Sequence, residues 1–192
     1  AENGARMTAM DKATENAGYF LTTLFPSNQL SIMDYNRVVK DLNGLSANDF
    51  LQKLDPAFSI EKKDKAYRPE NLHDFGLFLE NQWYKLSAKP GTYNNDPIGV
   101  LDISILQEHV LSSVLGIHDQ RTDKRIDFVG GIRGLEELEK RVNSGEMKLA
   151  ISLYPVSIEQ LFNIADSGNV MPPKSTWFEP KLRDGLLTHM ID

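Results

Sequence analysis

Two periods of apolar residues run along this chain, one typical of strands and one of helices. Runs rich in β-branched and aromatic residues predict strands. The clearest pair spans residues 75–79 and 83–86 on either side of a polar turn, which predicts a hairpin. Further strands are expected at residues 19–25 and 30–39, as a second hairpin, and at 58–60, 125–129, 148–154 and 186–191.

Helix starts are marked by capping residues. Ser46 precedes an apolar helical stripe with Asp49 three positions later, and Pro56 ends that helix. Ser157 and Gln160 form the pattern of a capping box. Two more helices are expected, one from an N-cap at Asp102 to about Leu115, and one over residues 135–142.

This mixture of hairpins and strand–helix alternation predicts an α+β fold. We expect a mixed, largely antiparallel sheet with about four packed helices. Residues 1–17 are polar and carry no strong apolar stripe, so they are expected to form a separate N-terminal segment. Residues 18–192 are expected to form a single α+β domain.

Composition narrows the functional classes. The net charge of −6 makes a nucleic-acid partner unlikely, since duplex binding depends on Lys and Arg neutralising phosphates. The chain has no cysteine, which excludes disulfides, thiolate zinc sites and cysteine nucleophiles. No apolar run approaches a membrane span, and no secretory signal opens the sequence, so a cytoplasmic protein is expected.

The segment from Met171 to Gly185 combines prolines, aromatics, lysines and hydroxyls, which indicates a rigid ordered loop. Within it, Lys174, Ser175 and Thr176 are residue types that bind anions, although the Walker A glycine frame is missing. The alternative is a proline-stiffened connection whose lysines are solvated. Lys181 lies later in the same loop.

A second candidate set comprises Asn36, Arg37 and Lys40, near the end of an expected strand. Arg37 could fork onto a phosphate, or it could pair with Asp34 or Asp41 for structural reasons. Phosphoryl transfer depends on positioning and charge neutralisation, and both sets supply suitable residues. The sequence does not show that the two sets converge.

Other candidates have simple structural explanations. His109 lies among apolar neighbours in an expected helix, which is typical of a packed residue. His118 is followed by Asp119, and the two could form a base with its orienting carboxylate or a loop contact. Gly130–Gly131 could let the backbone approach a phosphate or could make a tight turn.

Three segments resemble the DUF1015 family: residues 35–42, residues 123–131, and residues 157–162 together with 171–185. Members of this family usually carry an Asp-Gly-His-His-Arg segment upstream of these motifs, and this chain has no adjacent histidines. The resemblance therefore implies that the chain is the C-terminal half of a longer protein, with the N-terminal half as its partner.

The family is similar to the ParB/sulfiredoxin-like superfamily, which includes kinases of free serine. The resemblance thus implies a small-molecule kinase with a nucleotide or pyrophosphate donor and Mg²⁺, whose main catalytic segment lies upstream. The isolated chain is expected to be inactive. A non-catalytic structural, regulatory or anion-binding domain is the alternative.

Overall fold

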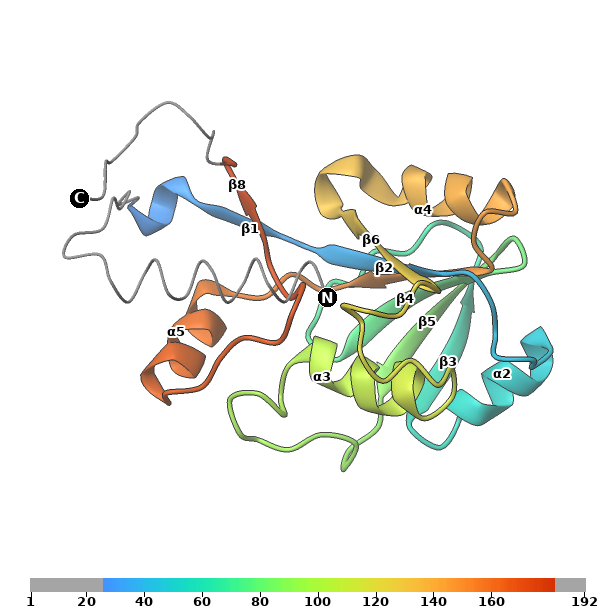
Figure 1. Cartoon of the computed structure of the whole chain (residues 1–192), viewed down its shortest axis with the longest axis horizontal. Coiled ribbons are helices and arrows are strands. Elements are labelled where there is room, and N and C mark those ends of the chain that lie inside the picture. Colours follow the sequence, from blue (N-terminus) through green and yellow to red (C-terminus); the bar gives the residue numbers. More distant parts are fainter. Residues whose placement is uncertain (1–25, 182–192) are drawn as a thin grey trace. The chain divides into compact units, whose positions relative to one another are not determined.

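A six-stranded antiparallel sheet forms the centre of the part that the structure describes, residues 26–181 of a computed structural model (Figure 1). The strand order is β3-β5-β4-β7-β2-β6, and each neighbouring pair in this order is antiparallel. The strands are β2 (Tyr35–Val39), β3 (Phe58–Lys63), β4 (Asp74–Leu79), β5 (Gln82–Ala88), β6 (Ile126–Gly130) and β7 (Leu149–Leu153).

The predicted hairpin is confirmed as β4 and β5, which pair from Asp74↔Ser87 to Leu79↔Gln82. Both turn residues adopt positive φ, at 50° for Glu80 and 60° for Asn81. This is the type I′ geometry that matches the twist of adjacent strands. The first predicted hairpin falls partly on residues 19–25, which lie outside the described residues, as does the expected strand 186–191.

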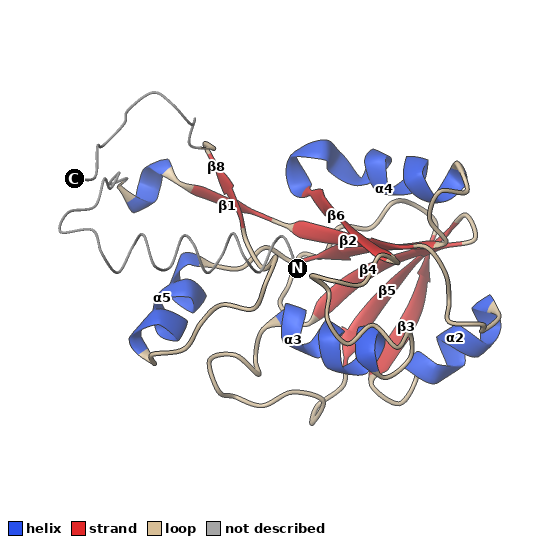
Figure 2. Ribbon diagram, viewed as in Figure 1, coloured by secondary structure: helices blue, strands red, loops and turns tan. Residues whose placement is uncertain are grey.

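Within residues 26–181, four α-helices accompany the sheet, so the predicted α+β class is confirmed (Figure 2). The cap of the first helix is the predicted one, because the Ser46 side chain accepts the Asp49 N–H. The capping box of the last helix is also complete, with reciprocal bonds between Ser157 and Gln160. The helices are α2 (Ala47–Leu54), α3 (Asp102–Leu106), α4 (Gly134–Asn143) and α5 (Ile158–Asp166).

Helices α2 and α3 lie on one face of the sheet and α4 lies on the other (Figure 1). On one face, α2 and α3 bury Phe50, Leu54 and Ile105 against Leu77 and Ile151 of the central strands. On the other face, α4 buries Leu138 against a smaller cluster that includes Val38 and Ala150. Because side chains alternate along a strand, β2 sends Arg37 to the α2–α3 face and Asn36 to the α4 face.

The predicted helix from Asp102 to Leu115 lies at the expected position, but its N-cap and its helix type differ from the prediction. The N-cap is Leu101, and Asp102 is the first helical residue. Its carboxylate accepts the His73 backbone N–H instead of capping its own helix. After Leu106 the chain widens into a π-helical segment, η2 (Gln107–Ser112). Such segments are rare and frequently lie at functional sites.

A short ribbon extends from β2. Strand β1 (Ser31–Met33) pairs antiparallel with β8 (Trp177–Glu179), from Ser31↔Glu179 to Met33↔Trp177. The predicted strand over 30–39 is therefore divided at Asp34 between two sheets. The expected proline-rich loop also contains this short strand, which gives the Lys174 segment a fixed end.

The chain divides into two units, one of residues Ser31–Glu179 and one of residues 1–30 with 180–192. Of the second unit, the structure describes a 3-10 turn, η1 (Ser27–Gln29), and residues 180–181. The expected boundary at residue 18 lies outside the described residues. Within residues 26–181, no helix has the length and apolar character needed to cross a membrane.

Candidate functional site: a buried arginine beside a cavity

The side chain of Arg37 lies in the middle of the fold with only 1% of its surface exposed. Its Nε donates to Gln120 Oε1 at 3.1 Å, and its terminal nitrogens donate to the carbonyl oxygens of Tyr35 and Lys174, the latter at 2.8 Å. All three acceptors are neutral. No carboxylate within residues 26–181 forms an ion pair with Arg37, so the predicted alternative of pairing with Asp34 or Asp41 does not occur there.

Aromatic rings surround this guanidinium and the ammonium of Lys174. Arg37 lies 5.3 Å from the ring centre of Phe128 and 5.8 Å from that of Tyr35. Lys174 Nζ lies 5.6 Å and 6.0 Å from the same two rings. Trp177 meets Tyr35 edge-on, with centroids 5.2 Å apart. We call Tyr35, Arg37, Phe128, Lys174 and Trp177 the cationic cluster.

Burial changes the electrostatics of the cationic cluster. It lowers the pKa of the Arg37 guanidinium to about 9, and the nearby Tyr35 opposes the shift only in part. The guanidinium is still charged at pH 7. Two cations thus share two rings without a carboxylate to neutralise Arg37, which is an arrangement that favours a bound anion.

The Lys174 segment reaches the cluster from the far end of the sequence. Lys174 has a left-handed backbone with φ of 58°, which directs its carbonyl to Arg37. Ser175 is buried, and its hydroxyl donates to the Pro172 carbonyl, so it braces the segment. Thr176 is half-buried between Ser175 and the start of β8.

The remaining predicted residues do not join the cluster. Asn36 faces α4, where its amide donates to Asp34 and accepts from the Leu153 N–H. Lys40 is exposed just beyond the other end of β2, where it lines a small cavity with Glu80 and Lys148. Lys181 is exposed and belongs to the other unit, so it is not assigned to the cluster. The structure therefore unites only Arg37 with the Lys174–Thr176 segment.

The glycine pair at the end of β6 serves packing. A Cβ on Gly130 would lie 2.7 Å from the Trp177 ring, and one on Gly131 would lie 2.1 Å from Asp34 Oδ1. Both positions need glycine because neighbouring side chains already occupy the space. This geometry assigns the pair to the junction of β1, β2 and β8, and the predicted phosphate approach has no support from it.

A cavity of about 910 Å³ lies next to Arg37's partner Gln120. It opens between the α3–η2 helix, the segment around Gln120, and the prolines that precede Lys174. A cavity of this size with a few polar groups is the usual form of a small-molecule site. Its lining residues include Ile103, Ser104, Gln107, Glu108, Ser112, His118, Asp119, Gln120, Arg121, Pro172 and Pro173.

Two side chains of the cavity wall, Gln120 and Gln107, form a chain of hydrogen bonds that ends at Arg37. Gln120 Nε2 donates to Gln107 Oε1 at 2.7 Å, and Gln107 Nε2 donates to Ser112 Oγ at 2.7 Å and to the Ile117 carbonyl at 2.8 Å. Because Gln120 Oε1 accepts from Arg37, each amide has one defined orientation. The widened turn at η2 is thus connected by hydrogen bonds to the buried guanidinium.

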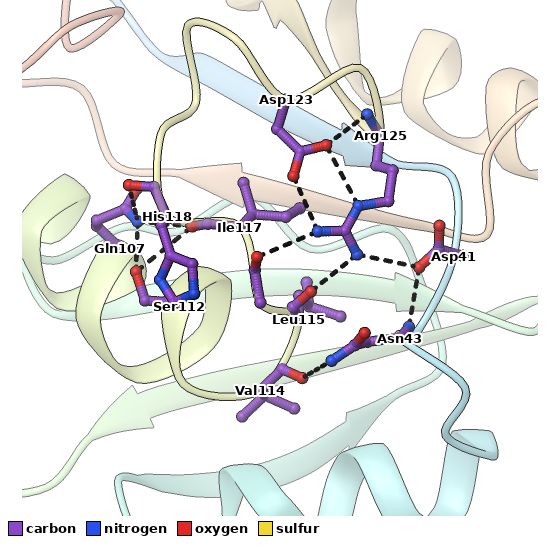
Figure 3. A network of polar contacts seen from close by, with 11 residues as sticks. Asp41, Asn43, Gln107, Ser112, Val114, Leu115, Ile117, His118, Asp123 and Arg125 are labelled. Carbon is purple, nitrogen blue, oxygen red and sulfur yellow. Dashed lines mark hydrogen bonds and ion pairs between the residues drawn. The ribbon is translucent and has the colours of Figure 1, made fainter.

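The segment after η2 is held from its opposite side by Arg125 (Figure 3). Arg125 donates to the carbonyls of Leu115 at 2.9 Å and Gly116 at 3.2 Å. Its Nη2 also donates to Asp123 Oδ2 at 2.8 Å. This contact lowers the pKa of the Asp123 carboxyl. Asn43 donates to the Val114 carbonyl at 3.2 Å. The carbonyls that a helix end leaves without partners are therefore satisfied by side chains.

The histidines have separate roles. His109 contacts the Thr92 carbonyl at 2.7 Å, as expected for a packed residue. His118 lines the cavity, while its neighbour Asp119 pairs with Arg121 at 3.0 Å. Among residues 26–181, no group of three histidine or acidic side chains is placed to hold a metal ion.

One acidic site was missed by sequence reasoning. Asp102 is 6% exposed, and its Oδ1 accepts the His73 N–H at 2.9 Å and lies 3.1 Å from His73 Nδ1. Its Oδ2 is buried without a hydrogen-bond partner in the described structure. Burial raises the pKa of this carboxyl to about 6, against the lowering effect of His73. The only sequence signal was its position as an expected helix cap.

Solved structures with this fold include free serine kinases. Free serine kinase in complex with AMP has a TM-score of 0.52 and 12% identity, and a variant of that kinase with AMP has a TM-score of 0.51 and 14% identity. Each comparison covers 82% of this chain and 57% of the kinase chain, so this chain spans little more than half of their length. At such identities the likeness shows the fold alone.

The sequence model of the family described as "Protein of unknown function (DUF1015)" matches residues 1–104. The match includes Asn36, Arg37 and Lys40 and ends before the Lys174 segment. No curated protein matches the chain. Since the match covers more than half of the sequence, the predicted family is confirmed, and the chain belongs to the DUF1015 family.

Proposed function

We propose that this chain is the anion-binding part of a small-molecule kinase that phosphorylates free L-serine. The donor would be a nucleotide or pyrophosphate, accompanied by Mg²⁺, and the main catalytic segment would lie in an N-terminal half of the same protein. The observation that carries the proposal is the charge of Arg37, which is buried among neutral acceptors beside Lys174. The shared fold with free serine kinases bound to AMP supports it.

The chemistry of phosphoryl transfer explains why such a cluster would be useful. The transferred group carries negative charge on several oxygens, so catalysis depends on fixed positive charge and positioning. The exposed ammonium of Lys174 would contact a phosphate directly as a point charge. Arg37 would supply a fixed field behind it, and Ser175 would hold the segment in place.

The phosphates of the donor offer Mg²⁺ better ligands than the described residues of this chain do. The described residues contain no three-ligand group for a metal, and Mg²⁺ commonly binds through substrate phosphates with only one or two carboxylates. The proposal therefore gives residues 26–181 no role in holding the ion. When bound with the donor, Mg²⁺ would neutralise phosphate charge.

The proposal is tested by phosphoserine formation in the full-length protein, with ATP, ADP or pyrophosphate as donor and Mg²⁺ present. Lys174→Ala should lower kcat/KM for the donor by roughly tenfold or more, because one direct phosphate contact is lost. Lys62→Ala, an exposed lysine on the edge strand β3, is the matched control and should leave kcat/KM unchanged. Unchanged turnover in both Lys174→Ala and Arg37→Ala would refute the proposal.

A non-catalytic anion-binding domain is the second candidate, favoured by the burial of Arg37, whose side chain is only 1% exposed and so does not face a reacting group directly. The two candidate functions use the same site, but they predict different effects of a substitution in it. A regulatory domain predicts that Lys174→Ala abolishes the response of activity to added anion while basal turnover persists. Turnover by the isolated chain would exclude this candidate.

A further inference from the structure

Gln120 occupies the place where a carboxylate would neutralise Arg37. Its Oε1 lies 3.1 Å from Arg37 Nε, and its side chain is 6% exposed. Glutamate at this position would differ by one atom and would form a buried ion pair with the arginine. The chain instead has an amide, which accepts the hydrogen bond and leaves the charge in place.

Gln120 also belongs to the wall of the 910 Å³ cavity. It is the one residue of the described lining that contacts Arg37 through a side-chain hydrogen bond. Charge acts over longer distances and is screened less inside a protein than in water, so a buried guanidinium next to this wall influences what the cavity binds.

The effect of the Arg37 charge on binding depends on the other charges that line the cavity. Asp119 and Arg121 form an ion pair and largely cancel. Glu108 adds a negative charge, and His118 is the remaining titratable group among the lining residues. Without Arg37 the acidic lining would disfavour an anion. With Arg37 held by a neutral amide, the balance shifts towards one.

We propose that Gln120 is the specificity-determining residue of a binding site in this cavity for a phosphorylated small anion, because it accepts a hydrogen bond from Arg37 without neutralising the charge of the guanidinium. The inference rests on the proposed function: the lining includes Pro172 and Pro173, which directly precede Lys174, so a ligand whose phosphate contacts Lys174 would extend into this cavity. Gln107 is a positioning residue in the same arrangement, since its carbonyl oxygen accepts from Gln120 and fixes the amide orientation.

The test measures pyrophosphate affinity of the 192-residue chain by calorimetry at constant salt, with ATP as a second probe. Gln120→Glu should weaken binding about tenfold or more, because an ion pair with Arg37 removes the field in the cavity. Gln120→Leu removes the same hydrogen bonds but adds no charge, and should weaken binding less than about threefold. Gln52→Glu, on the exposed face of α2, controls for the added negative charge and should bind like wild type.

Three outcomes would overturn the inference. Pyrophosphate affinity of Gln120→Glu equal to that of Gln52→Glu would remove the charge argument while leaving the proposed function intact. Gln120→Leu could bind as weakly as Gln120→Glu, which makes Gln120 a structural residue only. Absence of any pyrophosphate or ATP binding by the wild-type chain would refute this inference together with the anion-binding function on which it rests.

A second variant covers the case in which Gln120→Glu does not fold. Ser113 is exposed and lines the cavity. Ser113→Glu adds a carboxylate at the rim without touching Arg37 or Gln120, and should lower pyrophosphate affinity several-fold. Unchanged affinity in a folded Ser113→Glu protein would show that the anion does not bind in this cavity.

Discussion

At the scale of single residues, two buried charged groups stand out because their surroundings do not neutralise them in the usual way. Arg37 has three neutral acceptors, and Asp102 has one buried oxygen without a hydrogen-bond partner in the described structure. Both have a pKa shifted by burial. Such groups cluster at functional sites because selection for stability alone would pair or remove them.

The raised pKa of Asp102 predicts how the stability of the fold depends on pH. Its pKa is raised in the folded protein, from an ordinary 3.8 to about 6, so the folded state binds the proton more tightly than the unfolded state. The stabilising contribution is complete below about pH 4 and is lost as the pH rises through about 6. Asp102→Asn cannot ionise, so its stability relative to wild type should improve by up to about 3 kcal/mol between pH 4 and pH 7.

Denaturant unfolding at several pH values measures this difference. Asp64→Asn changes an exposed aspartate and should show no comparable pH dependence relative to wild type. A stability difference between Asp102→Asn and wild type that stays constant from pH 4 to pH 7 would show that Asp102 ionises normally.

At the scale of elements, the segment from Val114 to His118 joins the sheet to the cavity. Gln107 holds it from the side of η2, and Arg125 holds it from the side of β6 (Figure 3). Since Gln107 also orients Gln120, the position of this segment determines the geometry around Arg37. The π-helical turn is what brings Gln107 into this position.

Arg125→Ala is predicted to destabilise the chain by about 2–3 kcal/mol, because two carbonyl contacts and the Asp123 partner are lost together. Arg121→Ala removes an arginine from an exposed pair only four residues earlier, and should leave stability close to wild type. Urea unfolding distinguishes the two variants. Equal stability of both would mean that Arg125 is merely another surface arginine.

Elements that depend on local sequence were predictable, and their contacts were not. Ser46 and Ser157 bond to residues three positions away, so their caps follow from sequence spacing. Two of the three partners of Arg37, by contrast, lie 83 and 137 positions away. Arg37 is buried beside groups that are distant in sequence, among them Gln120, Phe128 and Lys174.

The candidate site was predicted in part for the same reason. Residue type singled out Arg37 and Lys174 as candidate cations, but the sequence did not show that they lie close together, and Asn36 and Lys40 were grouped with Arg37 by proximity in sequence. In a strand, the neighbouring residue points to the opposite face, so Asn36 was separated from Arg37 by the pleat itself. Gln120 and Gln107 gave no signal, because neutral amides are common in surface segments.

At the scale of the whole molecule, the chain matches a little over half of a free serine kinase in length and shares its fold. The cationic cluster and the cavity lie within the unit Ser31–Glu179. This placement predicts that the chain binds an anion by itself but needs further residues for turnover. Binding and catalysis can therefore be measured separately.

The most direct test of this account is a thermal-shift titration of the 192-residue chain with pyrophosphate and with ATP, each with and without Mg²⁺. The account predicts that the unfolding midpoint rises with ligand concentration in wild type and in Lys62→Ala, and that the rise is largely lost in Lys174→Ala. A midpoint that does not move in wild type, or that rises equally in Lys174→Ala, would contradict the claim that the cationic cluster forms an anion site.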